Sequence, residues 1–169
     1  MADEAVGISA VFDAVVAQAD TPMWVVTVAA GEQRAGCLVG FATQVSIEPR
    51  VFLACLSKAN RTYEIAQHAT HLAVHLLGTT ALPLAELFGS ETGSEIDKFD
   101  HCEWTEGPHL LPILTGAAGW FTGSITRTVD SGDHVGFLLS PTAAHLRKRP
   151  PTSLRYHAVA GLTPGHSAD

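Results

Sequence analysis

The stretch that decides the fold runs from Arg34 to Tyr63 and reads RAGCLVGFATQVSIEPRVFLACLSKANRTY. It contains two apolar runs, Gly36–Phe41 and Val51–Leu56, which are separated by a break at Pro49. Short apolar runs bounded by turn-forming residues are typical of buried β-strands. The stretch therefore predicts two strands in the core of the protein.

Hydrogen-bonding residues follow both predicted strands. The first strand leads into a small, polar segment: Ala42, Thr43, Gln44, Val45 and Ser46. The second leads into Ser57, Lys58, Ala59, Asn60, Arg61 and Thr62. Donors gathered at strand ends on a rigid sheet suit a flat, anionic ligand. Hydroxyls, cations and backbone N–H groups at a helix start favour a phosphate at the second cluster, although helix capping alone would also explain its Ser, Asn and Thr.

Length and composition limit the possible classes of protein. The chain has 169 residues, 46% of them hydrophobic and 16% charged, with a formal net charge of −7. This length predicts one domain with a sizeable core. A chain this apolar is expected to cover part of its surface in an oligomer. The negative charge argues against nucleic acid or an anionic membrane as the main partner.

The cysteines and the N-terminal residues predict a cytoplasmic protein. Cys37, Cys55 and Cys102 are widely spaced and form no C-x-x-C pair, so we expect reduced, buried thiols. The first nine residues, MADEAVGIS, do not have the pattern of a secretory leader. The apolar stretches are shorter than a membrane span.

Along the chain, hydrophobic periodicity and turn residues predict many strands and few helices. The predicted helices are 8–19, 60–68 and 80–88. The predicted strands are 23–29, 34–41, 51–56, 72–77, 100–104, 117–128, 134–145 and 154–159. This order favours a small closed or partly closed antiparallel barrel and leaves a sandwich open.

The decisive stretch resembles the flavin reductase-like family, the FMN-binding split barrels. The family pattern is a glycine, an apolar run, a Thr/Ser-rich segment, Val-Ser, an acidic-Pro turn, an apolar strand and a Ser-Lys-x-Asn-x-Thr segment. This chain has those parts in order: Gly36, Cys37–Phe41, Ala42–Gln44, Val45-Ser46, Glu48-Pro49, Val51–Leu56 and Ser57–Thr62. Leu84–Phe88, Asp97–Phe99 and Gly132–His134 match later family segments, so the resemblance covers about residues 20–158.

The resemblance implies a mainly β fold: a small antiparallel Greek-key split barrel with two or three short helices. It implies a single domain over residues 1–169, with a core at about 20–158 and a flexible tail at 160–169. It also implies a homodimer that binds flavin at the subunit interface.

The family's site residues carry over position by position. The resemblance implies that the FMN phosphate binds at Ser57, Lys58, Asn60 and Thr62. It implies that the flavin ring lies against Phe41, Ala42, Thr43, Gln44, Val45 and Ser46. His134, after Gly132-Asp133, is the expected catalytic residue beside the flavin, and a histidine can deliver a proton near neutral pH.

The expected activity is a flavin reductase that transfers hydride from NAD(P)H to FMN, or to FAD, and supplies reduced flavin to a partner monooxygenase. The chain has no Gly-rich dinucleotide fingerprint, so NAD(P)H is expected as a transient cosubstrate. No metal is expected, because His71 and His75 lie on a predicted strand, where four residues span about 13 Å.

The sequence departs from the family at three positions, which keeps two alternatives open. Gly40 and Phe41 stand where many members have Ser or Asn and a small polar residue, and Arg50 replaces a second proline. Phe41 would narrow access to the ring and favour a non-catalytic FMN-binding or electron-carrier protein. The same changes are compatible with a 5-deazaflavin-dependent oxidoreductase.

Overall fold

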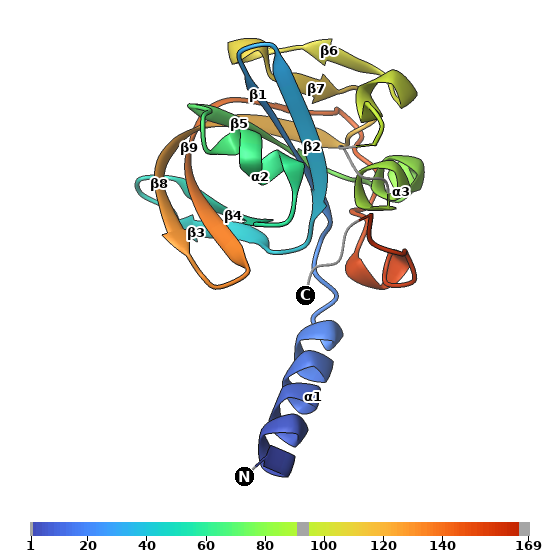
Figure 1. Cartoon of the computed structure of the whole chain (residues 1–169). Helices are drawn as coiled ribbons and strands as arrows, with labels where there is room; N and C mark the ends of the chain where they lie inside the picture. The colour runs from blue at the N-terminus through green and yellow to red at the C-terminus, as the bar shows by residue number, and fades with distance from the viewer. Residues whose placement is uncertain (1, 91–94, 166–169) are drawn as a thin grey trace.

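The computed structural model describes residues 2–90 and 95–165. Its main sheet has seven strands in the order β2–β1–β5–β8–β9–β4–β3, and every neighbouring pair is antiparallel. The strands are β1 Trp24–Ala30, β2 Gln33–Val39, β3 Ala42–Ser46, β4 Val51–Ser57, β5 His71–Leu76, β8 Gly119–Asp130 and β9 His134–Leu146. Figure 1 shows this sheet curled around helix α2 (Arg61–Ala66).

The curl follows from one short connection. β2 and β3 are the two edge strands of the sheet, yet only Gly40 and Phe41 join them. The strand ends Val39 and Ala42 are three residues apart and can be separated by at most about 11 Å, so the edges must approach each other at this point. The Cys55 N–H on β4 donates to the Phe41 carbonyl at 2.9 Å, which holds the crossing against the sheet. The sheet is therefore a barrel that remains split along the free edge of β2.

The barrel interior is an apolar core that is capped by α2. Val26, Leu56, Leu72 and Phe137 are buried there, and the buried residues of this core come from five strands and from α2 itself. Asn60 caps the start of the helix, because its side-chain oxygen accepts the Thr62 N–H at 3.0 Å. Helix α2 thus fills one end of the barrel beside β1 and β2.

A second layer covers the outer face of β1 and β2. It contains α3 (Leu82–Ser90), the 3-10 turns η1 (Thr79–Ala81) and η2 (Lys98–His101), and the two-stranded sheet of β6 (Trp104–Glu106) and β7 (Pro112–Leu114). The shorter turns η3 (Pro108–Leu110) and η4 (Tyr156–Ala158) complete the chain. Gly36 permits the close packing of this layer, because a Cβ there would lie 2.7 Å from the Phe88 ring.

Helix α1 (Ala2–Gln18) projects from the body of the protein (Figure 1). Its last turn is held by His157, whose Nε2–H donates to the Ala17 carbonyl at 2.6 Å. The His157 backbone N–H donates to the Asp20 carboxylate at 2.7 Å, and Asp20 adopts a left-handed φ of 47°. The C-terminal segment therefore fixes the direction in which α1 leaves the barrel. No helix within the described residues is long and apolar enough to cross a bilayer.

The predicted mainly β split barrel and its three α-helices are confirmed, and most strands match the sequence prediction. The strand predicted at 100–104 begins only at Trp104, the first residue of β6, because the Asp97 carboxylate accepts the Phe99 N–H and caps η2 before it. The predicted edge strand 154–159 is wrong. Its residues make one isolated bridge, from Arg155 to Pro22, and the turn η4, since the Asp20 carboxylate accepts the N–H of His157.

The segment that follows Val159 is held against the body as far as it is described. Leu162 packs against the apolar cluster between the sheet and the second layer, which includes Val25 and Phe88. The Gly165 N–H donates to the Gly89 carbonyl at 3.4 Å. The flexible tail predicted at 160–169 stays a prediction. Its residues 166–169 lie outside the described residues.

His75 joins the two layers through a buried imidazole. Its Nδ1–H donates to the Val25 carbonyl on the neighbouring strand at 2.9 Å, and its Nε2 accepts the Leu114 N–H from β7 at 3.1 Å. Burial lowers the pKa of His75 to about 4. The bond from Leu114 requires the neutral ring, because a protonated Nε2 would face the Leu114 N–H, whereas the bond from Nδ1–H to Val25 is possible in either state.

We expect His75 to make stability depend on pH between about 6.5 and 4. Above pH 6.5 both states carry a neutral ring; as the pH falls, the unfolded chain binds the proton first. Each pH unit in this window should then cost about 1.4 kcal/mol of unfolding free energy from this residue. His75→Gln can make both hydrogen bonds without titrating, so its denaturation curves should lack this slope. Equal slopes for the variant and the native protein between pH 6.5 and 5 would refute the assignment.

Candidate functional site: a cavity at the barrel seam

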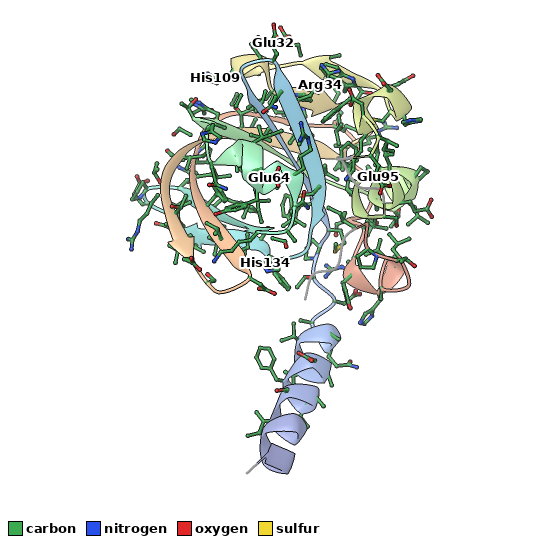
Figure 2. The ribbon with its side chains drawn as sticks, viewed as in Figure 1. Glu32, Arg34, Glu64, Glu95, His109 and His134 are labelled. Atoms are coloured by element: carbon green, nitrogen blue, oxygen red, sulfur yellow. The ribbon has the colours of Figure 1, made fainter. Side chains whose placement is uncertain are left out.

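A cavity of about 880 Å³ opens where the barrel is split. Its walls come from α1, the end of β2, the β2–β3 crossing, the end of β4, the start of β9 and the C-terminal segment. The lining residues include Phe12, Val16, Met23, Cys37, Leu38, Val39, Gly40, Phe41, Cys55, Leu56, Ser57, Asn60, His134 and Tyr156. This volume is typical of pockets for cofactor-sized ligands. Figure 2 shows His134 at the end of the barrel that faces α1.

The polar end of the cavity lies where β4 gives way to α2. Ser57 ends β4, and its hydroxyl accepts the Ala59 N–H at 3.3 Å. Asn60 follows as the helix cap and lines the same cavity. Two of the four residues predicted to bind phosphate therefore face one space.

Lys58 and Thr62, the other two, do not line this cavity. The Lys58 ammonium donates to both oxygens of Asp130 at 3.0 and 2.9 Å, and its N–H donates to the Asp133 carbonyl. Lys58 and the Gly132 N–H hold the pKa of Asp130 below its usual value. Thr62 is completely buried, so its side chain belongs to the core. Lys58 thus ties the helix start to the β8–β9 hairpin.

His134 and Phe41 meet at the mouth of the cavity. Their ring centroids are 5.1 Å apart with the planes tilted by 58°, and the Phe41 side chain is 60% exposed. The Nδ1–H of His134 donates to the Asp133 carboxylate at 2.8 Å, which lowers the pKa of Asp133. Because an ionised carboxylate only accepts, the contact keeps a proton on Nδ1 of the imidazole. His134 is thus held at the cavity mouth by a neighbour on each side.

Residues Thr43 to Ser46 do not join this site within one chain. They form β3, whose antiparallel register places Ala42 opposite Ala54 but Ser46 opposite Val51, at the far end of β4 from Ser57. Thr43, Gln44 and Val45 are exposed. The residues predicted to contact the flavin ring and those predicted to bind its phosphate were expected to line one crevice. Within one chain, Phe41 is the predicted ring contact that lines the same cavity as Ser57 and Asn60.

Several cavity residues escaped the sequence analysis. Cys37 and Cys55 were expected only to be reduced, buried thiols, and both line the cavity. Burial raises the pKa of Cys37 to about 11 and also raises that of Cys55, so both are protonated at neutral pH and act as apolar wall. Phe12 and Val16 on α1 also contribute. Their helical spacing was visible, but the direction of the helix depends on contacts with the C-terminal segment.

Fold and cavity together define a small split-barrel domain with a cofactor-sized site at its seam. Comparison with known proteins agrees. The reductase subunit HsaB of a flavin-dependent monooxygenase from Rhodococcus jostii is 31% identical over 134 residues, which cover 76% of this chain and 67% of that protein. The FMN reductase (NADH) RutF of Ancylobacter novellus is 34% identical over 140 residues, 78% of this chain and 75% of that protein.

A solved structure, the NADH:FAD oxidoreductase SgcE6 of Streptomyces globisporus, superposes with a TM-score of 0.71 at 27% identity, covering 77% of each chain. The flavin reductase like domain model matches residues 16–160. The chain belongs to this family. Two relatives from Rhizobium meliloti that match over 114 residues are longer, and the chain spans 36% and 48% of their length.

Proposed function

We propose that this protein is a flavin reductase that passes hydride from NAD(P)H to FMN or FAD. The observation that carries the proposal is the seam cavity, in which His134, Phe41, Ser57 and Asn60 meet although they come from separate parts of the chain. Membership in the flavin reductase like family supports the same activity. The relatives HsaB and RutF are named as a monooxygenase reductase subunit and an FMN reductase.

The cavity has the chemistry that a flavin requires. Met23, Val39 and Leu56 offer apolar walls for a flat ring, and Ser57 and Asn60 offer hydrogen-bonding groups at the opposite, polar end. When bound, a flavin supplies the acceptor for the hydride that a reduced nicotinamide donates. Hydride transfer needs no protein acid, so the chief contribution of the chain is to hold two flat rings in contact and to exclude water.

We propose two roles at the cavity mouth. His134, held by Asp133, is the group that can exchange a proton with bound ligand, because it alone among the described residues of the cavity carries an imidazole there. Phe41 packs on His134 and limits the space available to a second ring. The flavin contacts of Thr43, Gln44, Val45 and Ser46 remain a prediction. Because these residues lie away from the cavity of their own chain, they could contact only a flavin that is bound in the cavity of a second copy.

We expect purified protein supplied with FMN or FAD to oxidise NADH or NADPH, followed by nicotinamide absorbance. His134→Gln should lower kcat about tenfold and leave the dissociation constant of FMN unchanged, because it removes the proposed proton-exchanging group while the hydride step itself needs no protein acid. Glu86→Gln, a substitution on the outer helix α3, is the matched control. Tight flavin binding without turnover by NADH or NADPH would indicate a non-catalytic electron carrier instead. A bound cofactor with a deazaflavin spectrum would indicate a deazaflavin-dependent oxidoreductase.

Lys58 provides a test of the phosphate end. If the predicted role is correct, Lys58→Ala should weaken FMN about tenfold but leave riboflavin, which has no phosphate, unchanged. Asp130→Asn frees the Lys58 ammonium from its carboxylate partner and should strengthen FMN relative to riboflavin. Fluorescence quenching titrations measure both. Parallel changes for FMN and riboflavin in either variant would contradict a phosphate contact.

We also propose that the protein is a homodimer. α1 exposes Ile8, Val11, Phe12, Val15 and Val16 at helical spacing. The β3 edge and its turn expose further apolar side chains: Phe41, Val45 and Ile47. Together these eight exposed residues present on the order of 800 Å², about the area that one partner contributes to a stable interface. Both patches flank the cavity, so a dimer would complete its open side.

We expect a dimer in size-exclusion chromatography with light scattering. Val15→Glu places a charge in the exposed apolar stripe and should yield monomer, while Ala10→Glu, on the opposite side of α1, should remain dimeric. Both positions are exposed within the chain, so neither substitution disturbs its core. A native protein that is monomeric at micromolar concentration would contradict the proposal.

The partner and the compartment follow from the same proposal. HsaB is named as the reductase subunit of a flavin-dependent monooxygenase, which supports a monooxygenase as the consumer of reduced flavin here. The three free thiols and the need for NAD(P)H favour the cytoplasm.

A further inference from the structure

Asp13 on α1 brings to the seam cavity a charge that the proposed reductase site does not use. It is the one carboxylate among the described residues that line the cavity, and none of those residues is a lysine or an arginine. The Asp13 side chain makes no hydrogen bond or ion pair with any residue that the structure describes. The cavity therefore presents an unpaired carboxylate to the molecule that it binds.

The helical repeat of α1 directs Asp13 toward the cavity. Four residues from one side of the helix line the cavity: Phe12, Asp13, Val16 and Ala17. Successive residues of an α-helix are about 100° apart around its axis. Val15, a member of the exposed apolar stripe, is therefore nearly opposite Asp13, and it does not line the cavity. Asp13 can thus face a ligand while the stripe is covered by a second copy.

Tyr156 borders the cavity from the C-terminal segment, which lies beside the end of α1 (Figure 1). Its backbone N–H donates to the Thr21 carbonyl at 2.9 Å. The next residue, His157, donates from Nε2–H to the Ala17 carbonyl at 2.6 Å. Ala17 is four residues from Asp13, or about 6 Å along the helix axis. One set of contacts therefore brings a carboxylate and an aromatic ring to the outer wall of the cavity.

A carboxylate and an aromatic ring together suit a flat cation. The face of a tyrosine ring attracts a cation, and a carboxylate adds charge attraction. Phe41 and His134 present two further rings at the cavity mouth, where a flat group can pack. The outer wall would repel an anion, which leaves the end at Ser57 and Asn60 for a phosphate.

We propose that Asp13 and Tyr156 form a subsite for a flat aromatic cation in the outer wall of the seam cavity. The identity of that cation, the oxidised nicotinamide ring, rests on the proposed reductase function. The neutral reduced nicotinamide becomes a pyridinium cation when a hydride leaves it with both electrons of the broken C–H bond, and the flavin is the acceptor. Asp13 attracts the nicotinamide ring more strongly as this positive charge develops, so it favours hydride departure more than binding of the reduced form.

The test compares a neutral and a cationic ligand of similar shape. Nicotinamide and its ring-methylated cation are each titrated into the purified protein and followed by NMR chemical shifts. The native protein should bind the cation about fivefold more tightly than the neutral compound. Asp13→Asn should remove this difference and Tyr156→Leu should reduce it. Asp100→Asn, at an exposed position of η2 that does not line the cavity, is the matched control and should leave it unchanged.

A second measurement connects the subsite to the nicotinamide. In the FMN-reducing reaction, Asp13→Asn should weaken product inhibition by NAD⁺ about fivefold, the loss expected for one ion-to-ring contact, and leave the dissociation constant of FMN unchanged. A cation preference that depends on Asp13, in a protein that oxidises neither NADH nor NADPH, would defeat the reductase proposal and leave the subsite to another cation. Equal affinities of the native protein for the two probes, or the same preference in Asp13→Asn, would overturn the inference.

Discussion

The crossing from β2 to β3 through Gly40 and Phe41 is the constraint on which the rest of the structure depends. It forces the two edge strands of a seven-stranded sheet to meet at one point while they diverge elsewhere. Had the connection been long, the same strands could have remained an open sheet or formed a sandwich. The hydrogen bond from Cys55 to the Phe41 carbonyl locks this geometry. The seam of the barrel, with its cavity, is a direct consequence.

The seam places ligand-binding groups on rigid elements. Strand ends supply Ser57 and His134, the helix cap supplies Asn60, and the crossing itself supplies Phe41. Groups supported in this way keep their positions without a ligand, which is what two-ring chemistry demands of a protein. Two of the cations around the seam are neutralised in a chain whose net charge is −7, because Lys58 is paired with Asp130 and Arg34 with Asp97.

Helix α1 shows how a distant contact can shape a site. The helix makes part of the cavity wall, yet His157 and Asp20 hold its last turn through bonds to Ala17 and to the C-terminal segment. Those contacts bring together residues nearly 140 positions apart. They direct an apolar helix away from the barrel, where its stripe can be buried only against another molecule. The large apolar fraction of the chain is explained in part by this exposed face.

The amino-acid sequence by itself predicted most of the strands, favoured a barrel and placed hydrogen-bonding residues at the turn after β4, because those depend on local periodicity and on turn residues. The run from Gly36 to Leu56, with its break at Pro49, was sufficient to predict β2 and β4. Tertiary structure alone decided three further points. The pairing register of β3 with β4 places Ser46 opposite Val51, at the end of β4 that is remote from Ser57. The Asp20 carboxylate turned the expected last strand into η4. The Asp130 carboxylate bound Lys58. These outcomes depend on which distant groups compete for the same hydrogen bonds, and no local pattern in the chain records that competition.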